Sequence, residues 1–176
     1  MTIHIPAWVN GTLAPVGKME AHEKGLRHKA VSIFLLRDDC VLLQRRALSK
    51  YHTPGLWANT CCTHPHWGEN ALECAHRRLR EELEITHASL EYCDTVEYRA
   101  DVGKGLIEHE VVDIFVGELP EPQAPRPNPA EVMDTVWHPM ATLAHDVLTR
   151  PEIFTPWLRI YLRDHAEKIF GLTLDG

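Results

Sequence analysis

Short apolar runs separated by turn residues dominate the N-terminal quarter of the chain and predict two β-hairpins. The stretch WVNGTL places Asn10 and Gly11 between two apolar runs, which is a strong signal for a tight hairpin turn. Residues 30–36 and 41–44 are rich in β-branched and other apolar side chains, and three polar residues, RDD, separate them. We expect these two runs to form a second hairpin.

A long irregular stretch follows and leads into a helix. Residues 46–69, RALSKYHTPGLWANTCCTHPHWGE, hold too many proline, glycine and polar interruptions for one element. We interpret them as a long ordered loop, a kind of segment that is often functional. Asn70 is a suitable N-cap, and Glu73 can complete a variant of the capping box. Apolar residues then recur every three or four positions and predict a buried helical stripe of Leu72, Ala75, Leu79 and Leu83.

The second half of the chain again mixes strands and helices. Residues 120–129 hold five prolines and predict an extended surface loop. Thr155 and Pro156 suit the start of a last helix, and Gly171 suits its end. The expected elements are strands at 94–99, 106–119 and 135–138 and helices at 140–149 and 157–170. Because no regular βαβ rhythm occurs, we expect one mixed α/β (α+β) domain over residues 1–176.

Composition narrows the range of functions. The chain has 176 residues and a net charge of -7, so a nucleic-acid partner is not expected. Five cysteines without a CxxC spacing indicate a reduced, cytoplasmic protein with no disulfide framework. The N-terminus lacks the pattern of a secretory signal, and no apolar run approaches the roughly 18 residues that a membrane span needs, so no membrane contact is expected.

A group of histidines and glutamates forms a candidate metal site. Glu108 and Glu110 are two positions apart on an expected strand, so both carboxylates point to one face, which Val112 and Ile114 direct to the interior. Buried carboxylates are costly unless they are paired or bind a cation. The candidate ligands for an ion such as Mn²⁺, Zn²⁺ or Mg²⁺ are His22, His28, His64, Glu108 and Glu110. The alternative is a solvated strand end with unrelated histidines.

Cys62 is a second candidate for chemistry. It precedes His64 by two positions, and a cysteine beside a histidine can be a nucleophile, a metal ligand or a proton donor. The alternative is a buried structural cysteine, a role that suits Cys61 better. A structural zinc site is disfavoured because the chain has no second cysteine pair to complete it.

A basic cluster is the third candidate. Arg45, Arg46 and Lys50 lie between an expected strand and the irregular loop, and Lys18 and Arg78 can add to them. In an acidic chain such a cluster suits a diphosphate, because arginine offers a bidentate fork and lysine a point charge. The alternative is a solvated basic strand edge.

The helix after Asn70 resembles a modified Nudix box. That pattern is Gly, five residues, Glu, seven residues, and then Arg-Glu-apolar-x-Glu-Glu-x-Gly-apolar. The matching residues are Glu69, Arg77, Leu79, Glu81, Glu82 and Ile85. Thr63, Arg78 and Glu84 replace the two glycines and one glutamate of the pattern, and these changes weaken the metal cluster of Nudix hydrolases. The acidic residues can still hold Mg²⁺ that bridges to phosphates, or they form ordinary ion pairs along an amphipathic helix.

A more specific resemblance covers residues 8 to 171. The stretches KMEAHEKGLRHKAVSIFL, LLQRRALSKYHTPGLWANTCCTHPHWGE, RRLREELEI, VEYRA and GLIEHEVVDIF are similar, in matching order, to type I isopentenyl-diphosphate isomerases. The resemblance implies a single Nudix-like isomerase domain, with a mixed β-sheet between helices and an N-terminal hairpin extension. It also implies action on a small prenyl diphosphate; the sequence does not reveal the oligomeric state, and a monomer is favoured.

The family's functional residues fall on matching positions of this chain. The resemblance implies catalytic roles for Cys62, Glu110 and Tyr98, and metal binding by His22, His28, His64, Glu108 and Glu110. Glu82 matches a carboxylate that helps hold Mg²⁺ with the substrate diphosphate. The implied substrate contacts are Lys18, Arg46, Lys50 and Arg78 for the diphosphate and Trp157 for the prenyl group.

The implied reaction moves a carbon–carbon double bond by adding one proton and removing another through a carbocation-like state. Cys62 and Glu110 are the pair of proton-transfer groups that such a reaction needs on opposite faces of a flat substrate. Two other hypotheses remain: a Nudix hydrolase that cleaves a diphosphate, and a non-catalytic module that binds one. The replacements Arg78 and Glu84 argue against a hydrolase. The presence of both Cys62 and Glu110 argues against a non-catalytic binding module.

Overall fold

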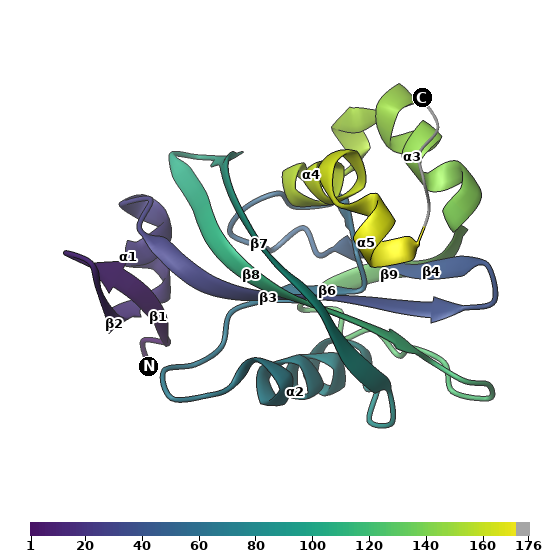
Figure 1. Ribbon diagram of the computed structural model, residues 1–176, viewed down its shortest axis with the longest axis horizontal. Coiled ribbons are helices and arrows are strands. Elements are labelled where there is room, and N and C mark those ends of the chain that lie inside the picture. Colours follow the sequence, from purple (N-terminus) through teal and green to yellow (C-terminus); the bar gives the residue numbers. More distant parts are fainter. Residues whose placement is uncertain (172–176) are drawn as a thin grey trace.

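A computed structural model describes residues 1–171 and shows one mixed sheet with helices on both sides (Figure 1). The strands are β1 (His4–Val9), β2 (Thr12–Gly17), β3 (Arg27–Arg37), β4 (Cys40–Arg46), β5 (Trp57–Ala58), β6 (Cys61–Thr63), β7 (Ser89–Gly103), β8 (Leu106–Glu118) and β9 (Val132–Pro139). The helices are α1 (Lys18–Glu23), α2 (Ala71–Leu83), α3 (Met140–Thr149), a 3-10 turn η1 (Pro151–Ile153), α4 (Pro156–Asp164) and α5 (Ala166–Phe170). In the described part, no helix is long and apolar enough to cross a membrane.

Strand β3 is the centre of the sheet. It pairs in parallel with β8 and antiparallel with β1, β4 and β6. The β3–β4 ladder is short and joins only Leu36 to Val41 and Arg37 to Cys40, because β6 then takes the place beside β3. The predicted loop at 46–69 therefore contributes two short strands, and its residues 61–63 become part of the sheet.

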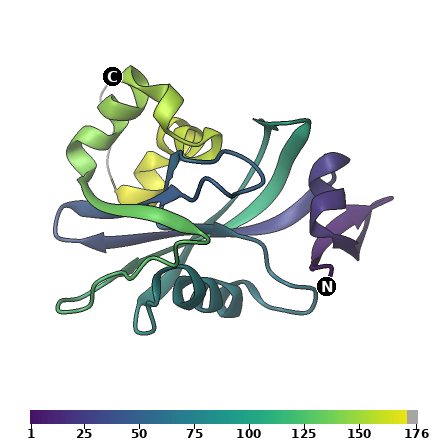
Figure 2. The ribbon, with the colours of Figure 1, turned by 180° about the vertical axis from the view of Figure 1, so that it is seen from behind.

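The sheet has an apolar core on each face. Alternating residues of β3 separate the two: Val31, Ile33 and Leu35 pack with α2, whereas Ala30 and Phe34 pack with α3, α4 and α5. Figure 2 shows the same arrangement from behind, with α2 on one side of the sheet and the C-terminal helices on the other. The hairpin β1–β2 and α1 form a third, smaller core at one end.

Most predicted elements are present, with four differences. Asn70 and Glu73 do form a capping box, but Leu72 is 42% exposed, so the buried stripe of α2 begins at Cys74 and Ala75 instead. The strands around the Gly-rich turn are longer than predicted, because they pair with each other along most of their length.

The other two differences concern the last helix. It is two helices, because the chain leaves helical geometry at His165 between α4 and α5. Thr155 stands at the N-cap but makes no capping hydrogen bond with its side chain. Gly171 closes α5 in a left-handed conformation, as predicted.

Candidate active site

Three neighbouring strands place His28, Glu110 and Tyr98 side by side on the face of the sheet that α4 covers. His28 is the register partner of Glu110 in the β3–β8 ladder, and Tyr98 is its partner in the β7–β8 ladder. Glu108 lies two residues before Glu110 and shares its face, as predicted. All four side chains are buried, so the sequence places two carboxylates, an imidazole and a phenol inside the protein.

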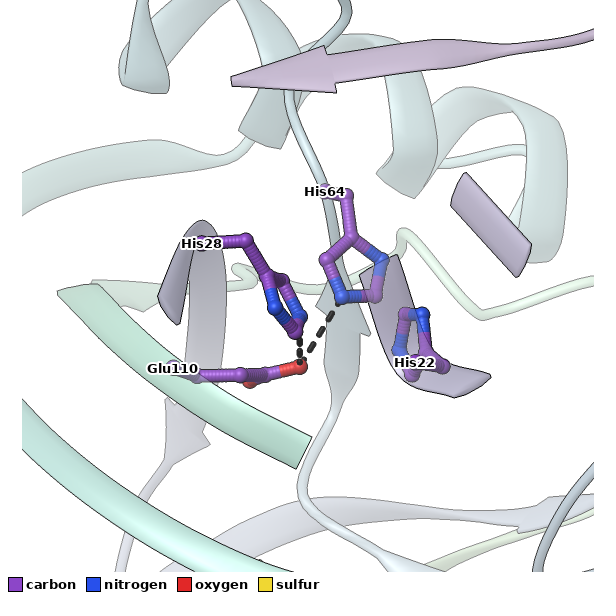
Figure 3. Close-up of side chains that lie close together, drawn as sticks. All are labelled: His22, His28, His64 and Glu110. Carbon is purple, nitrogen blue, oxygen red and sulfur yellow. Dashed lines mark hydrogen bonds and ion pairs between the residues drawn. The ribbon is translucent and has the colours of Figure 1, made fainter. Parts of the chain in front are cut away.

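Three histidines from separate segments converge on Glu110 (Figure 3). His22 comes from α1, His28 from β3, and His64 from the residue after β6. The Glu110 Oε1 atom lies 2.9 Å from His64 Nε2 and 3.4 Å from His28 Nε2. The four ligand atoms of this group all lie within 4.8 Å of one another.

Hydrogen bonds to backbone carbonyls fix the imidazole rings of His22 and His28, so that the unprotonated Nε2 atom of each neutral ring faces the cluster. His22 Nδ1 donates to the Lys18 carbonyl at 2.7 Å, and His28 Nδ1 donates to the Leu26 carbonyl at 2.6 Å. Because a carbonyl can only accept, the Nε2 atoms of the neutral rings carry lone pairs. Both Nε2 atoms are buried without a hydrogen-bond partner. In divalent-cation sites, imidazole rings are oriented by a hydrogen bond at one nitrogen and present the other, unprotonated nitrogen to the ion. These histidines, which face a carboxylate, therefore fit a metal ion.

The pKa shifts of His22 and His64 agree with this role, whereas that of His28 goes the other way. Burial lowers the pKa of His22 to about 4, so its ring is neutral at pH 7. Burial, together with nearby Lys18, lowers the pKa of His64 well below its usual value. At His28, burial lowers the pKa, but Glu110 outweighs it and the net shift is upward, because the carboxylate favours positive charge at this place.

The second carboxylate has a partner that the sequence did not reveal. Glu108 Oε1 lies 3.0 Å from Nε2 of His52, a buried residue of the long loop. Together with His22, this pair forms a second group with metal-ligand spacing. The Tyr98 hydroxyl lies 2.8 Å from Glu108 Oε2 and 2.9 Å from Glu110 Oε2, so it links the two carboxylates.

Cys62 lies on the same side of the sheet and is held by polar neighbours. Its Sγ donates to Asn59 Oδ1 at 2.8 Å and lies 3.2 Å from Ser32 Oγ, which in turn lies 2.8 Å from the Tyr161 hydroxyl. Burial raises the pKa of the Cys62 thiol, although the bond with Ser32 opposes that shift. Cys62 therefore keeps its proton at neutral pH, whereas the neighbouring histidines lower the pKa of Glu110 despite its burial.

The predicted basic cluster borders the same cavity. Lys18, Arg46, Lys50 and Arg78 all line it, together with Cys62, Tyr98, Glu108, Glu110 and Trp157. The Arg46 guanidinium lies 5.2 Å from the centre of the Trp157 ring. Arg45 is not part of this set, because its Nε atom donates to the Gly55 carbonyl instead.

Glu82 differs from the other predicted residues, because it belongs to neither histidine group and does not line the cavity. Its carboxylate is buried and accepts hydrogen bonds from Arg78 and from Gln44 Nε2 at 2.8 Å. The structure thus places Glu82 beside the basic cluster and separate from the imidazoles.

The cavity is small, with a volume of about 20 Å³. That space holds about one water molecule. The side chains that line it must therefore move apart before a larger molecule can enter. Residues with long flexible stems, such as Lys18 and Lys50, form part of this wall.

The sequence did not predict the residues that contact and orient Cys62 and Glu108. Ser32, Asn59 and Tyr161 support Cys62, and His52 supports Glu108. Ser32 carried a usable signal, because it is a polar residue in the otherwise apolar run AVSIFLL. The strand register then places it directly opposite Cys62. His52 carried no such signal, since the loop that contains it lacks a regular pattern.

Comparisons with known proteins identify the family of this chain. The model of the NUDIX domain family matches residues 26–158. A protein of Jannaschia sp. (strain CCS1) named isopentenyl-diphosphate Delta-isomerase is 67% identical over 176 residues, which are all of both chains. A Cereibacter sphaeroides (strain ATCC 17025 / ATH 2.4.3) protein of the same name is 64% identical and covers 95% of this chain and 94% of its own.

Solved structures show the same fold at low sequence identity. The Deinococcus radiodurans protein DR0079 superposes with a TM-score of 0.72 at 15% identity, over 91% of this chain and 97% of its own. A MutT NUDIX hydrolase from Burkholderia pseudomallei gives a TM-score of 0.59 at 22% identity, over 79% and 98%. At these identities the likeness extends to the fold alone.

Proposed function

This chain belongs to the NUDIX domain family and, within it, to the isopentenyl-diphosphate Delta-isomerases, and we propose from this that it interconverts isopentenyl diphosphate and dimethylallyl diphosphate. One observation of the site supports the proposal most strongly. A protonated thiol, Cys62, and an ionised carboxylate, Glu110, line one small cavity next to a cluster of cations. A double-bond shift needs such a pair, with one group to give a proton and one to accept it.

Tyr98 extends the proton-transfer system. Its hydroxyl has one proton to donate and lies within hydrogen-bond distance of both Glu108 and Glu110. When the Tyr98 hydroxyl donates its proton to one of these carboxylates, it can only accept a hydrogen bond from the other. The second carboxyl group must then be protonated so that it can donate. The three side chains therefore have a place for an additional proton, and Tyr98 can orient that proton or relay it to Glu110.

We assign His22, His28, His64 and Glu110, whose ligand atoms lie close together, to a divalent ion, Mn²⁺, Zn²⁺ or Mg²⁺. We also assign Glu108 to this ion, although in the structure its carboxylate belongs to the adjoining group with His22 and His52. When bound, the ion changes the proton affinity of its carboxylate ligands. The imidazole nitrogens with no other partner support this assignment. Glu82 is proposed to help hold Mg²⁺ together with the substrate diphosphate, which requires it to exchange part of its contact with Arg78.

The cationic wall of the cavity suits the diphosphate end of the substrate. Lys18, Arg46, Lys50 and Arg78 supply charge and hydrogen-bond donors at one end of the site. Binding energy from this end positions the five-carbon alkene for reaction at the other end. Because the cavity volume is about 20 Å³, these side chains must rearrange to admit the substrate.

The apolar part of the site protects the carbocation-like state. Trp157 is buried and lines the cavity, where its aromatic ring can stabilise developing positive charge, an interaction of up to about 2 kcal/mol when desolvated. Exclusion of water prevents addition of a hydroxyl group to that state. The small cavity and the packed helix α4 support this role.

Diphosphate hydrolysis is disfavoured. In the Nudix-box helix, Arg78 stands where hydrolases have a glutamate and binds Glu81 at 2.7 Å and Glu82. An arginine within the acidic cluster neutralises charge that hydrolases use to bind catalytic metal ions.

We further propose that the protein is a monomer and that residues 1–176 form a single enzyme domain. We also propose that it acts in the cytoplasm, a location that its five free cysteines support.

Proton NMR of isopentenyl diphosphate with the enzyme in D₂O tests the function. We expect deuterium to enter dimethylallyl diphosphate as the double bond moves. An unchanged substrate spectrum in the presence of Mg²⁺ and Mn²⁺ would contradict the proposal, and release of inorganic phosphate would favour hydrolysis.

A further inference from the structure

The segment before β9 carries a carboxylate, Glu131, to the edge of the basic cluster. Backbone hydrogen bonds hold the segment against the end of α2, from Arg126 N to the Leu83 carbonyl and from Asn128 N to the Glu82 carbonyl, both at 2.8 Å. The Glu131 carbonyl accepts from Ala47 N at 3.0 Å, directly after β4. Glu131 therefore has a fixed backbone position between two elements of the site.

Its side chain contacts two of the four cations that line the cavity. The Glu131 carboxylate accepts a hydrogen bond from Lys50 Nζ and lies 3.4 Å from Arg78 Nη2. Arg78 has two other carboxylate partners, Glu81 and Glu82. For Lys50, residues 1–171 offer no second carboxylate within ion-pair distance, so its ammonium group is paired with Glu131 alone.

The charges around the cavity explain why such a partner is needed. Four cations converge on a space of about 20 Å³, where they repel one another. Burial alone would raise the pKa of Glu131, but Lys50 and Arg78 lower it, so the carboxylate is ionised at neutral pH. Glu131 does not itself line the cavity, and it compensates the cations from outside.

We propose that Glu131 is a positioning residue, an exchangeable counter-ion that holds Lys50 while the diphosphate subsite is empty and releases it to the incoming diphosphate. The inference rests on the proposed function, which assigns Lys50 to the substrate. In the empty protein Glu131 offsets repulsion among the cations. Once a diphosphate brings its own negative charge, Glu131 competes with it for Lys50 and weakens binding.

Removal of the charge therefore has two effects of opposite sign. In Glu131→Gln, the empty protein loses stability because the cations lose a counter-ion. The same variant binds a diphosphate more tightly, by about two- to fivefold, the factor that corresponds to a partly exposed ion pair. A purely structural role for Glu131 predicts the first effect without the second.

Calorimetric titration with inorganic pyrophosphate tests the proposal on the metal-loaded enzyme, first without free Mg²⁺ and then with it. We expect Glu131→Gln to have a lower Tm than the wild type without ligand, and a larger rise of Tm at saturating pyrophosphate. Its KM for isopentenyl diphosphate should fall in the same direction as its Kd for pyrophosphate. If wild-type enzyme binds no pyrophosphate, the assigned diphosphate subsite is wrong; if it binds and Glu131→Gln binds equally or more weakly, the exchange of Lys50 is wrong.

Two further variants separate the pair from a general charge effect. Glu81→Gln removes one negative charge beside the same Arg78 but does not contact Lys50, so we expect its pyrophosphate affinity to stay within about twofold of the wild type. In a Lys50→Met background the gain from Glu131→Gln must shrink to the small share that its contact with Arg78 provides, within about twofold, because the main competition requires the Lys50 ammonium group. A gain of full size without Lys50 would overturn the proposal. Weaker binding of pyrophosphate by Glu131→Gln only when Mg²⁺ is present would also overturn it, because Glu131 would then act through the metal ion.

Discussion

Cys61 and Cys62 are neighbours in β6, yet their side chains face opposite sides of the sheet. Cys61 is fully buried in the core beneath α2, and its Sγ lies 3.4 Å from Glu82 Oε2. Cys62 lines the cavity on the other face and contacts Ser32 and Asn59. The alternation of a strand thus gives two identical adjacent side chains two separate environments.

Substitution of either proposed proton-transfer group should stop the reaction. Cys62→Ala removes the thiol, and Glu110→Gln removes a carboxylate that can accept a proton, so we expect each to lower kcat by at least about 10³-fold. Deuterium incorporation into dimethylallyl diphosphate, followed by NMR, measures the loss. Circular dichroism and Tm show whether the fold persists.

Cys61→Ala is the matched control for the thiol. It shortens a buried side chain in the α2 core, so we expect a lower Tm and a kcat within a few-fold of the wild type. Full isomerase activity in Cys62→Ala, or a complete loss in a folded Cys61→Ala variant, would reverse the assignment of the two cysteines.

The metal site can be tested with two histidines of one short motif. His64 is buried with Nε2 2.9 Å from Glu110 Oε1, whereas His66, two residues later, is exposed. We expect His64→Ala to weaken binding of Mn²⁺ or Zn²⁺ by at least about tenfold and His66→Ala to leave it unchanged. Metal content after dialysis, measured by atomic emission, gives the result without an activity assay. Equal metal content in both variants would contradict the assigned ligands.

Local patterns predicted most of the fold, because they depend on neighbours in the chain. The turn at Asn10, the capping box at Asn70 and the shared face of Glu108 and Glu110 follow from spacing alone. The last helix was predicted as one piece because its apolar pattern continues, and the break at His165 leaves no clear signal in the sequence. Leu72 fits the helical period, but it lies in the first turn, where the core no longer covers it.

Residue types and spacing indicated candidate site residues, but they left the alternative of a solvated strand end with unrelated histidines open. His22, His28 and His64 come from three elements that only tertiary structure brings together, so the resemblance to a family was needed to favour one metal site. His22 and Lys18 even lie outside residues 26–158, which match the NUDIX domain. Helix α1 therefore adds an imidazole and a cation that the matched region of the domain does not contain.

Glu84 marks a position where the family pattern and backbone geometry agree. It stands where the Nudix box has glycine, and it ends α2 with φ 52°, in the left-handed region. A side chain there is strained, so we expect Glu84→Gly to raise the free energy of unfolding by about 0.5–1 kcal/mol. Chemical denaturation measures the change. Its control is Glu84→Ala, which keeps the strain and should bring no gain; equal stabilisation by both would attribute the effect to the lost carboxylate.

Lys18 should make diphosphate binding depend on pH. Burial, together with Lys50 and Arg78, lowers the pKa of Lys18 to about 8 in the protein without ligand. The protonated form binds phosphate oxygens, so affinity for pyrophosphate should fall as the pH rises through about 8. Lys18→Arg stays charged over this range and should lack that loss. The comparison of the two proteins removes the titration of pyrophosphate itself, which both share.

Linkage gives the same pKa a second consequence, for stability. An unfolded lysine keeps its proton up to about pH 10.4, whereas folded Lys18 loses it near pH 8, so the unfolded state binds more protons between these values. Below about pH 8 the buried ammonium group of Lys18 therefore lowers the free energy of unfolding by its full amount. This destabilisation decreases as the pH rises from about 8 to about 10.4. Urea denaturation of wild type and Lys18→Met at pH 7 and pH 9.5 measures it. We expect the gain in stability from Lys18→Met to be larger at pH 7, and an equal gain at both values would show that the ammonium group is not desolvated by the fold.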